Sequence, residues 1–156
     1  MTCDGICRGR FFARCPRHQD GVRPCHHYRV VYTDGACTNN GSFSAVSGIG
    51  IAFGLEGEKG YQFSIPVDDN LDPGGKRTSQ RAELLAALEG LKKIGDHDEG
   101  YFAHNSRTRR EDSDEPEIIV TTDSEYVVKG MTEWLPTWKV IATIIVCCIH
   151  FISLHL

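Results

Sequence analysis

The chain has 156 residues, a mass of 17.4 kDa and a formal net charge of −4 at pH 7, which leaves room for one domain of ordinary size. Its 40% hydrophobic and 24% charged residues are typical of a globular protein, and its N-terminus lacks the apolar core of a secretion signal. A negative charge argues against nucleic-acid binding. The charge is unevenly distributed, however, with a net +4 on residues 1–29 and a net −5 on residues 96–117. The negative net charge of the chain therefore does not exclude a basic binding face.

A β-rich segment from Tyr28 to Thr33 is the first predicted element. Aromatic and β-branched residues favour a strand there, and Gly35 with residues 39–41 supplies turn residues directly after it. We therefore expect Asp34 at the end of a strand. An Asp before a Gly is on its own more often the start of a turn, so a functional role for Asp34 needs support from the rest of the chain.

Two further strands and a helix follow. Residues 47–53 and 60–67 have strand composition and complete a three-stranded antiparallel meander. Residues 79–94 show the 3.6-residue apolar spacing of an amphipathic helix. The apolar stripe of this helix consists of Leu84, Ala87, Leu88, Leu91 and Ile94. Residues 95–117 are polar, charged and aperiodic, so we predict a long acidic loop there.

The last predicted elements are a strand over residues 117–122 and a helix that Ser124 caps. Along this helix Tyr126, Gly130, Trp134 and Trp138 recur every four residues. The ordinary interpretation of such a stripe is packing into the core.

Three carboxylates occupy related places in these elements. Asp34 and Asp123 each follow a β-branched segment, and Glu83 lies in the first turns of the helix beside its apolar stripe. An acid near a helix N-terminus is also favoured by the helix dipole alone. The three placements nevertheless allow the carboxylates to converge at one site.

Three sequence blocks resemble a known family. They are residues 32–37 (Tyr-Thr-Asp-Gly-Ala-Cys), 80–84 (Gln-Arg-Ala-Glu-Leu) and 122–124 (Thr-Asp-Ser), followed by Trp134 and Trp138. In this order and spacing they resemble type 1 ribonuclease H of the eukaryotic kind, over about residues 29–139. The resemblance implies an α/β, ribonuclease H-like fold. Its mixed β-sheet would join the antiparallel meander to a parallel strand, with helices packed on it.

The resemblance also implies a reaction, the endonucleolytic hydrolysis of the RNA strand of RNA/DNA hybrids. Asp34, Glu83 and Asp123 would be the catalytic residues, and together with Gly35 they would hold the metal. Mg²⁺ prefers carboxylate oxygens, and Mn²⁺ is the alternative ion. Two divalent ions about 3.5–4 Å apart activate a water and relieve charge on the leaving oxygen. Clustered acids repel one another without a cation, which is a further reason to expect metal there.

Nucleic-acid contacts follow from the resemblance in two groups. The positions that match contacts to the RNA strand are Gly35, Ala36, Cys37, Asn40, Ser79 and Gln80. Tyr126, Trp134 and Trp138 would lie along the channel for the DNA strand, where aromatic side chains contact bases and sugars. The chain departs from the family at Ser79-Gln80, where many members have two asparagines.

Residues 1–27 form a leader rich in Cys, His and Arg. Without a secretion signal, its thiols are more often free or metal-bound than joined in disulfides. Cys15, His18, Cys25 and His27, beside His26, have the ligand types of a zinc site, although no standard finger pattern matches. A disordered basic leader is the alternative, and so is an arm whose arginines contact a nucleic-acid backbone.

The C-terminal residues 140–156 depart from the family. Thirteen of these 17 residues are apolar and none is charged, and the resemblance stops at Lys139. The family's last strand, its histidine-bearing loop and a final helix with a fourth acid would then be missing. We expect translated intron read-through, because every valine codon, including that of Val140, begins with the GT that usually opens an intron. Sequencing the transcript across the Lys139 codon tests this, with a membrane anchor and a buried strand as rivals.

The sequence thus divides into the leader (1–27), a partial domain (28–139) with its acidic insertion (95–117), and the apolar tail (140–156). Three functions stay open: a hybrid-cleaving endonuclease, a truncated hybrid-binding module with weak or no turnover, and a tail-anchored membrane protein. We expect an intracellular monomer of the nucleus or cytoplasm, with the mitochondrion as a third location. Its partner would be an RNA/DNA hybrid, with no obligate protein partner and no membrane.

Overall fold

The computed structural model describes residues 9–13, 27–55, 60–104 and 117–135. Its elements are β1 (Tyr28–Thr38), β2 (Val46–Ala52), β3 (Gln62–Pro66), α1 (Ser79–His104), β4 (Glu117–Thr121), α2 (Glu125–Lys129) and a π-helical turn, η2 (Gly130–Trp134). The strands form one sheet in the order β3-β2-β1-β4. β1 pairs antiparallel with β2, β2 antiparallel with β3, and β1 parallel with β4. The predicted α/β class and the meander plus parallel strand are confirmed.

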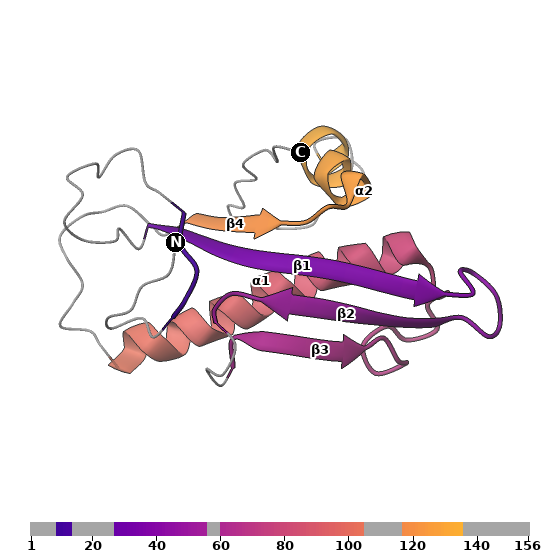
Figure 1. The fold of residues 1–156 in the computed structure, drawn as a ribbon, viewed down its shortest axis with the longest axis horizontal. Coiled ribbons are helices and arrows are strands. Elements are labelled where there is room, and N and C mark those ends of the chain that lie inside the picture. The colour runs from indigo at the N-terminus through magenta and orange to yellow at the C-terminus, as the bar shows by residue number, and fades with distance from the viewer. Residues whose placement is uncertain (1–8, 14–26, 56–59, 105–116, 136–156) are drawn as a thin grey trace.

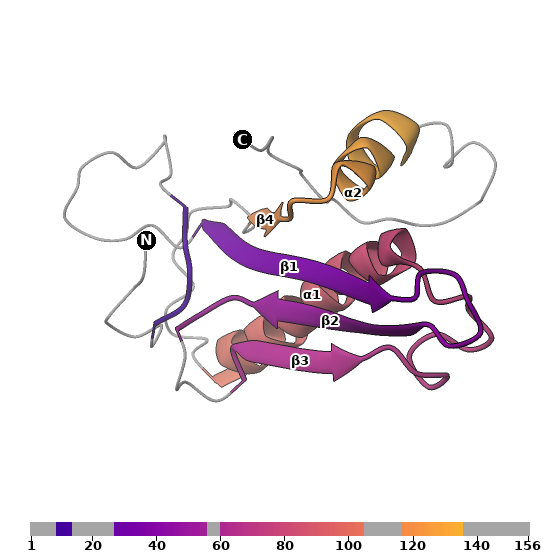
Figure 2. The same cartoon turned by 45° about the vertical axis from the view of Figure 1, so that its right-hand side comes forward.

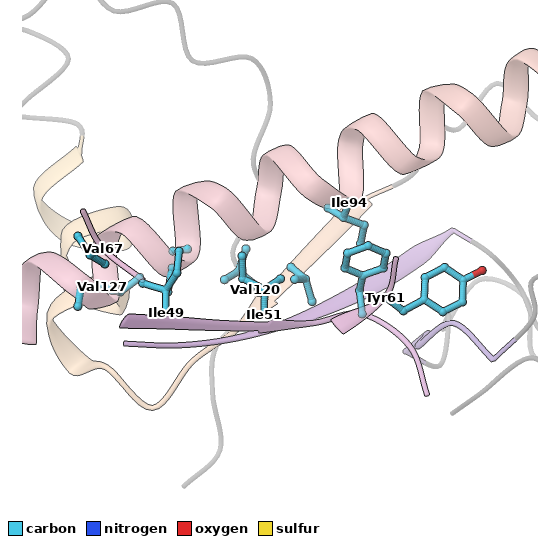
Figure 3. Close-up of a cluster of buried hydrophobic side chains, with 12 residues drawn as sticks. Ile49, Ile51, Tyr61, Val67, Ile94, Val120 and Val127 are labelled. Atoms are coloured by element: carbon cyan, nitrogen blue, oxygen red, sulfur yellow. The ribbon is translucent and has the colours of Figure 1, made fainter. Parts of the chain in front are cut away.

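The core lies between α1 and one face of the sheet. α1 runs across that face, while α2 follows β4 at the edge of the sheet (Figures 1 and 2). Ile49 and Ile51 point from β2 toward the helix, and Ile94 points from α1 toward the sheet (Figure 3). All three are almost fully buried. Burial of each such side chain stabilises the fold by roughly 1.5–3 kcal/mol, so this layer fixes α1 against β1 and β2.

Small residues on α1 let the helix lie close to the sheet. Ala82 and Ala86 are buried against it, and a Cβ added at Gly90 would come within 2.6 Å of Thr33 Cγ2. The residues in contact with the sheet are therefore mainly small ones spaced four apart. This geometry leaves Leu88 outside the core with 48% of its surface exposed, so its predicted place in the buried stripe is wrong. Of the other stripe residues, Ala87 and Ile94 are buried and Leu84 and Leu91 are partly buried.

α1 is longer than its sequence pattern predicts, because it continues past Gly95 to His104. The predicted loop from residue 95 is therefore wrong as far as residue 104, and residues 105–116 lie outside the described part of the chain. Gly95 costs a helix about 1 kcal/mol relative to Ala. The His97 ring packs against Phe53 and Tyr61, with centroid distances of 5.7 and 5.0 Å. These contacts extend the helix, and they depend on residues distant in the sequence.

Part of the predicted leader belongs to the folded domain. Arg10 bridges to Gly54 and Phe12 bridges to Arg29, in an antiparallel sense. The Phe11 N–H donates to the Phe53 carbonyl at 3.0 Å. Phe12 is 4% exposed, so this short segment contributes a side chain to the core. Within the described ranges, no helix has both the length and the apolar character needed to cross a membrane.

Candidate active site

Asp34 lies within a strand rather than at its end. β1 continues through Gly35 to Thr38, and Asp34 is paired with Gly50 of β2. The predicted strand end is wrong because β2 pairs with β1 through Gly35 as far as Thr38, so the turn starts only at Asn39. On the other side of β1, pairing with β4 ends at Tyr32 and Thr121. Asp34 lies two residues after Tyr32, and Asp123 lies two residues after Thr121. The parallel register therefore brings the two aspartates side by side.

Gly35 lets Glu83 reach these aspartates from α1. A Cβ at Gly35 would overlap the backbone of Ala82 and Glu83, so only glycine allows the helix to approach β1 this closely. The Gly35 N–H also donates a hydrogen bond to the Glu83 carboxylate. As a result, Asp34, Glu83 and Asp123 each offer an oxygen, and these oxygens lie within 4.8 Å of one another.

The start of α1 is fixed by two side chains outside its first turn. The Thr78 Oγ1 accepts a hydrogen bond from the Arg81 N–H at 3.2 Å, which is the bond of an N-cap. The Asn40 Oδ1, from the β1–β2 turn, accepts from the Ser79 N–H at 3.0 Å. These two hydrogen bonds fix the start of α1, and with it the position of Glu83 over β1.

Of the three carboxylates, Glu83 has the least favourable surroundings for a negative charge. Burial raises the pKa of Glu83 to about 7, and the charges of Asp34 and Asp123 add to the effect, against the hydrogen bond from Gly35. The Glu83 Oε2 atom is buried and accepts no hydrogen bond from the described residues. Three converging carboxylates with an oxygen lacking a partner are the donor set that Mg²⁺ or Mn²⁺ binds, so the residues present fit a divalent cation.

An open depression lies beside two of the acids. Its volume is about 480 Å³, and its lining residues are Tyr32, Thr33, Asp34, Gly50, Ala52, Thr121, Thr122 and Asp123. Gly50 and Ala52 of β2 leave this face of the sheet low next to Asp34. Asp34 and Asp123 are open to solvent on this face.

The RNase H family model matches residues 26–145. The chain belongs to the RNase H family. Among its relatives, the Ribonuclease H of Pseudomonas entomophila (strain L48) is 35% identical over 111 residues, which are 70% of this chain and 54% of that protein. The Ribonuclease H of Schizosaccharomyces pombe is 30% identical over 115 residues, 74% of this chain and 33% of that protein. The chain thus spans about half, or less, of the length of these relatives.

One comparison is with a solved structure. The RNase H domain of PFV is 28% identical and aligns with a TM-score of 0.42, covering 72% of this chain and 57% of that domain. RNase H is a family of nucleases, and nucleases are hydrolases.

The positions predicted to contact the RNA strand lie on the last part of β1, in the turn after it and at the start of α1. Ala36 and Gln80 are exposed, and Cys37 is a half-buried free thiol. Asn40 is exposed, but its Oδ1 is engaged with Ser79 as described above. Gly35, Asn40 and Ser79 thus have a structural role in the fold in addition to their predicted contact with RNA.

The aromatic residues predicted for the DNA strand lie on the α2–η2 segment. Ser124 caps α2 as predicted, accepting from the Val127 N–H at 3.4 Å. The rings of Tyr126 and Trp134 contact each other edge to face, with centroids 5.3 Å apart. Tyr126 is 38% exposed, and Trp134 is half-buried. Trp138 lies outside the described residues.

A buried ion-pair cluster next to the site is not apparent from the sequence. Asp72 is 5% exposed, and the Arg81 guanidinium donates to both its oxygens, Nε to Oδ2 at 2.5 Å and Nη2 to Oδ1 at 2.6 Å. Arg77 donates to Asp72 Oδ2 at 3.4 Å. Arg81 belongs to one of the family blocks, but Asp72 lies in a segment that reads as a polar loop. The cluster connects that loop to the first turn of α1.

The predicted zinc ligands are only partly described. Cys15, His18 and Cys25 lie outside the described residues, so the zinc site stays a prediction. His27 is buried, its Nε2 lies 3.2 Å from Glu117 Oε1, and its ring contacts Tyr28 edge to face. These contacts give His27 a packing role at the start of β1.

Proposed function

We propose that this domain hydrolyses the RNA strand of RNA/DNA hybrids, using Mg²⁺, or Mn²⁺ in its place, held by Asp34, Glu83 and Asp123. The observation that carries the proposal is the convergence of these three carboxylates within 4.8 Å in a chain of the RNase H family. Hydrolysis of a phosphodiester needs charge stabilisation and an oriented water, and clustered carboxylates with bound cations serve both needs.

The residues of the chain divide the work by position. Asp34 is exposed on β1 and Asp123 is exposed just after β4, so both can reach a cation at the surface. Glu83 comes from beneath, with its carboxylate oriented by the Gly35 N–H. Bound divalent ions supply an activated water and neutralise the leaving oxygen. Because the acids sit on a strand, a helix and a post-strand bend that are packed together, their geometry is fixed before substrate arrives.

Selectivity for a hybrid would come from two surfaces on either side of the acids. In this proposal the residues after Asp34 and the start of α1 contact one strand, whose 2′-hydroxyls distinguish RNA from DNA. Tyr126 and Trp134 offer aromatic rings to the other strand. We infer that the first strand is RNA, as the family resemblance implies for Gly35, Ala36 and Cys37.

A cleavage assay with three substrates tests the proposal. The full chain is incubated with end-labelled RNA/DNA hybrid, duplex DNA and single-stranded RNA, each in Mg²⁺ and in a chelator. We expect cutting of the RNA in the hybrid only, and only with metal. Asp34→Asn should reduce the rate by at least about 100-fold, because it removes a metal ligand without changing volume, whereas Cys37→Ala should change it less than about threefold.

The outcomes separate the two functions that the family leaves open. Cutting of all three substrates, or cutting that survives the chelator, contradicts the proposal. Metal-dependent binding of hybrid without cleavage would support the alternative, a hybrid-binding module that lacks turnover.

A further inference from the structure

The turn between β1 and β2 presents an exposed aromatic ring. The relative exposure of Phe43 is 115%, above that of any other large hydrophobic residue in the described ranges. A single exposed apolar side chain is ordinary on a protein surface. What distinguishes Phe43 is its setting, because the turn that carries it is rigidly built and adjoins the proposed substrate face.

The shape of the turn does not depend on the Phe43 ring. Asn39 and Gly41 adopt left-handed backbone angles, with φ of 52° and 75°. The Asn39 Nδ2 donates to the Ser44 carbonyl at 3.4 Å, and the Ser42 N–H donates to the Asn39 carbonyl at 2.9 Å. Backbone and short polar side chains therefore close the turn. The ring is left to contact something other than its own domain.

The turn is fastened to the start of α1. The Gly41 N–H donates to the Arg77 carbonyl at 2.8 Å, and Asn40 Oδ1 accepts from Ser79 as noted above. Arg77 is in turn held by Asp72. Both turn and helix start lie at the same end of the sheet (Figures 1 and 2). Phe43 thus has a fixed position relative to residues proposed to contact the RNA strand.

A lysine lies beside the same turn. A Cβ on Gly41 would lie 3.8 Å from Lys76 Nζ, so the Lys76 ammonium lies beside the turn. Lys76 is exposed, and it forms no ion pair with the residues that the structure describes. Of the neighbouring acids, Asp69 and Asp72 pair with Arg77, and Asp68 accepts hydrogen bonds from Asn70 and Leu71. The turn that carries Phe43 therefore has beside it a lysine that forms no ion pair with the described residues.

We propose that Phe43 and Lys76 form a second contact for the hybrid duplex, remote from the acids and resting on the proposed function. The minor groove of an A-like duplex is wide and shallow, so an exposed ring can pack against its sugars and base edges, while Lys76 pairs with a phosphate. Thr38 lies four residues beyond Asp34 in the strand, about 13 Å away, and the turn follows it. In this proposal β1 runs along the duplex, so that at about 3.4 Å per base pair the contact falls about four base pairs or more from the cut.

The distance gives the experiment, which measures binding and not turnover. The full chain carrying Asp34→Asn, in Mg²⁺, is titrated into fluorescent hybrids of about 6 and about 16 base pairs. Adding Phe43→Ala should weaken binding of the long hybrid at least about 5-fold, the lower end of the effect of losing an aromatic contact, and leave the short hybrid within about twofold. Adding Lys76→Ala should lower the slope of log K against log salt by about 0.9.

A matched control and the contrary outcomes complete the test. Leu55→Ala removes another exposed apolar side chain, 44% exposed and beyond the opposite end of β2, and should leave both affinities unchanged. Equal binding by the Phe43 variant and its parent, or an equal loss with both lengths, overturns this inference and leaves the proposed function standing. If the parent Asp34→Asn chain, with Phe43 and Lys76 unchanged, binds neither hybrid, this inference and the proposed function are both rejected.

Discussion

The raised pKa of Glu83 shows that a carboxylate at this position is unfavourable without a cation. In the unfolded chain its carboxyl ionises near 4.5, whereas in the folded protein burial and the two aspartates raise the pKa of Glu83 to about 7. The folded state therefore holds more protons than the unfolded state between these values. It follows that stability without metal falls as the pH rises through this window, and is constant above it.

This sign can be measured on the metal-free protein. Urea unfolding in a chelator should show the wild-type chain losing about 1–2 kcal/mol between pH 5 and pH 8, after allowance for the partial exposure of the site. Glu83→Gln should remove most of that loss and be the more stable protein at pH 8. Glu133→Gln, at an exposed position on η2, serves as the control and should follow the wild type. A Glu83 variant with the wild-type pH profile would show that Glu83 titrates normally.

Among the elements, α1 depends on the loop before it for its position over β1. Asp72 fastens that loop through Arg81 and Arg77, and a Cβ at Gly75 would overlap the Asp72 carboxylate. The hydrogen bond from Arg81 lowers the pKa of Asp72, and the charges of Arg81 and Arg77 lower it further, against the effect of burial. The resulting stabilisation is present above the ordinary value of 3.8 and is lost as the pH falls below it.

Replacing Asp72 should therefore loosen the start of α1. We expect Asp72→Asn to destabilise the fold by about 1–3 kcal/mol at pH 7, less than a fully buried pair because Arg81 is half exposed, and to flatten the acid limb of the stability curve. The measurement is urea unfolding at pH 7 and pH 3. Asp69→Asn is the matched control, since Asp69 pairs with the same Arg77 but its side chain is 86% exposed. Equal losses for the two variants would contradict a special role for Asp72.

The elements also show what the sequence can and cannot predict. The meander, the parallel strand and the three acids follow from local composition and from the family blocks. β1 runs past Gly35 because β2 lies beside it, and α1 runs past Gly95 because His97 meets Phe53 and Tyr61. Pairing and ring contacts of this kind join distant residues. A local pattern therefore registers the glycines as stops, while the tertiary structure overrides them.

At the scale of the whole molecule, the folded unit extends beyond the family match. The RNase H family match begins at residue 26, yet Arg10 pairs with Gly54, just past β2, and Phe12 pairs with Arg29 near the start of β1. Arg10 is 4% exposed, and its guanidinium lies 5.9 Å from the centroid of the Phe53 ring. The Val30 N–H donates to the Phe11 carbonyl at 3.1 Å. The segment thus covers backbone and aromatic surface where β1 begins, and its Phe11 ring contacts Tyr32 edge to face, with centroids 5.6 Å apart.

Loss of the Phe12 side chain should weaken the whole domain without altering the site. Phe12→Ala should lower the free energy of unfolding by about 3–4 kcal/mol, as expected for a buried Phe, and a chain beginning at His26 should be at least as unstable. Phe43→Ala makes the same chemical change at an exposed position and should cost less than about 0.5 kcal/mol. Denaturant unfolding of the three variants beside the wild type, in chelator and in Mg²⁺, decides the matter. Because Phe12 is remote from the acids, Mg²⁺ should stabilise Phe12→Ala by the same increment as the wild type. A Phe12 variant as stable as the Phe43 variant would mean that residues 9–13 lie on the domain without contributing to its stability.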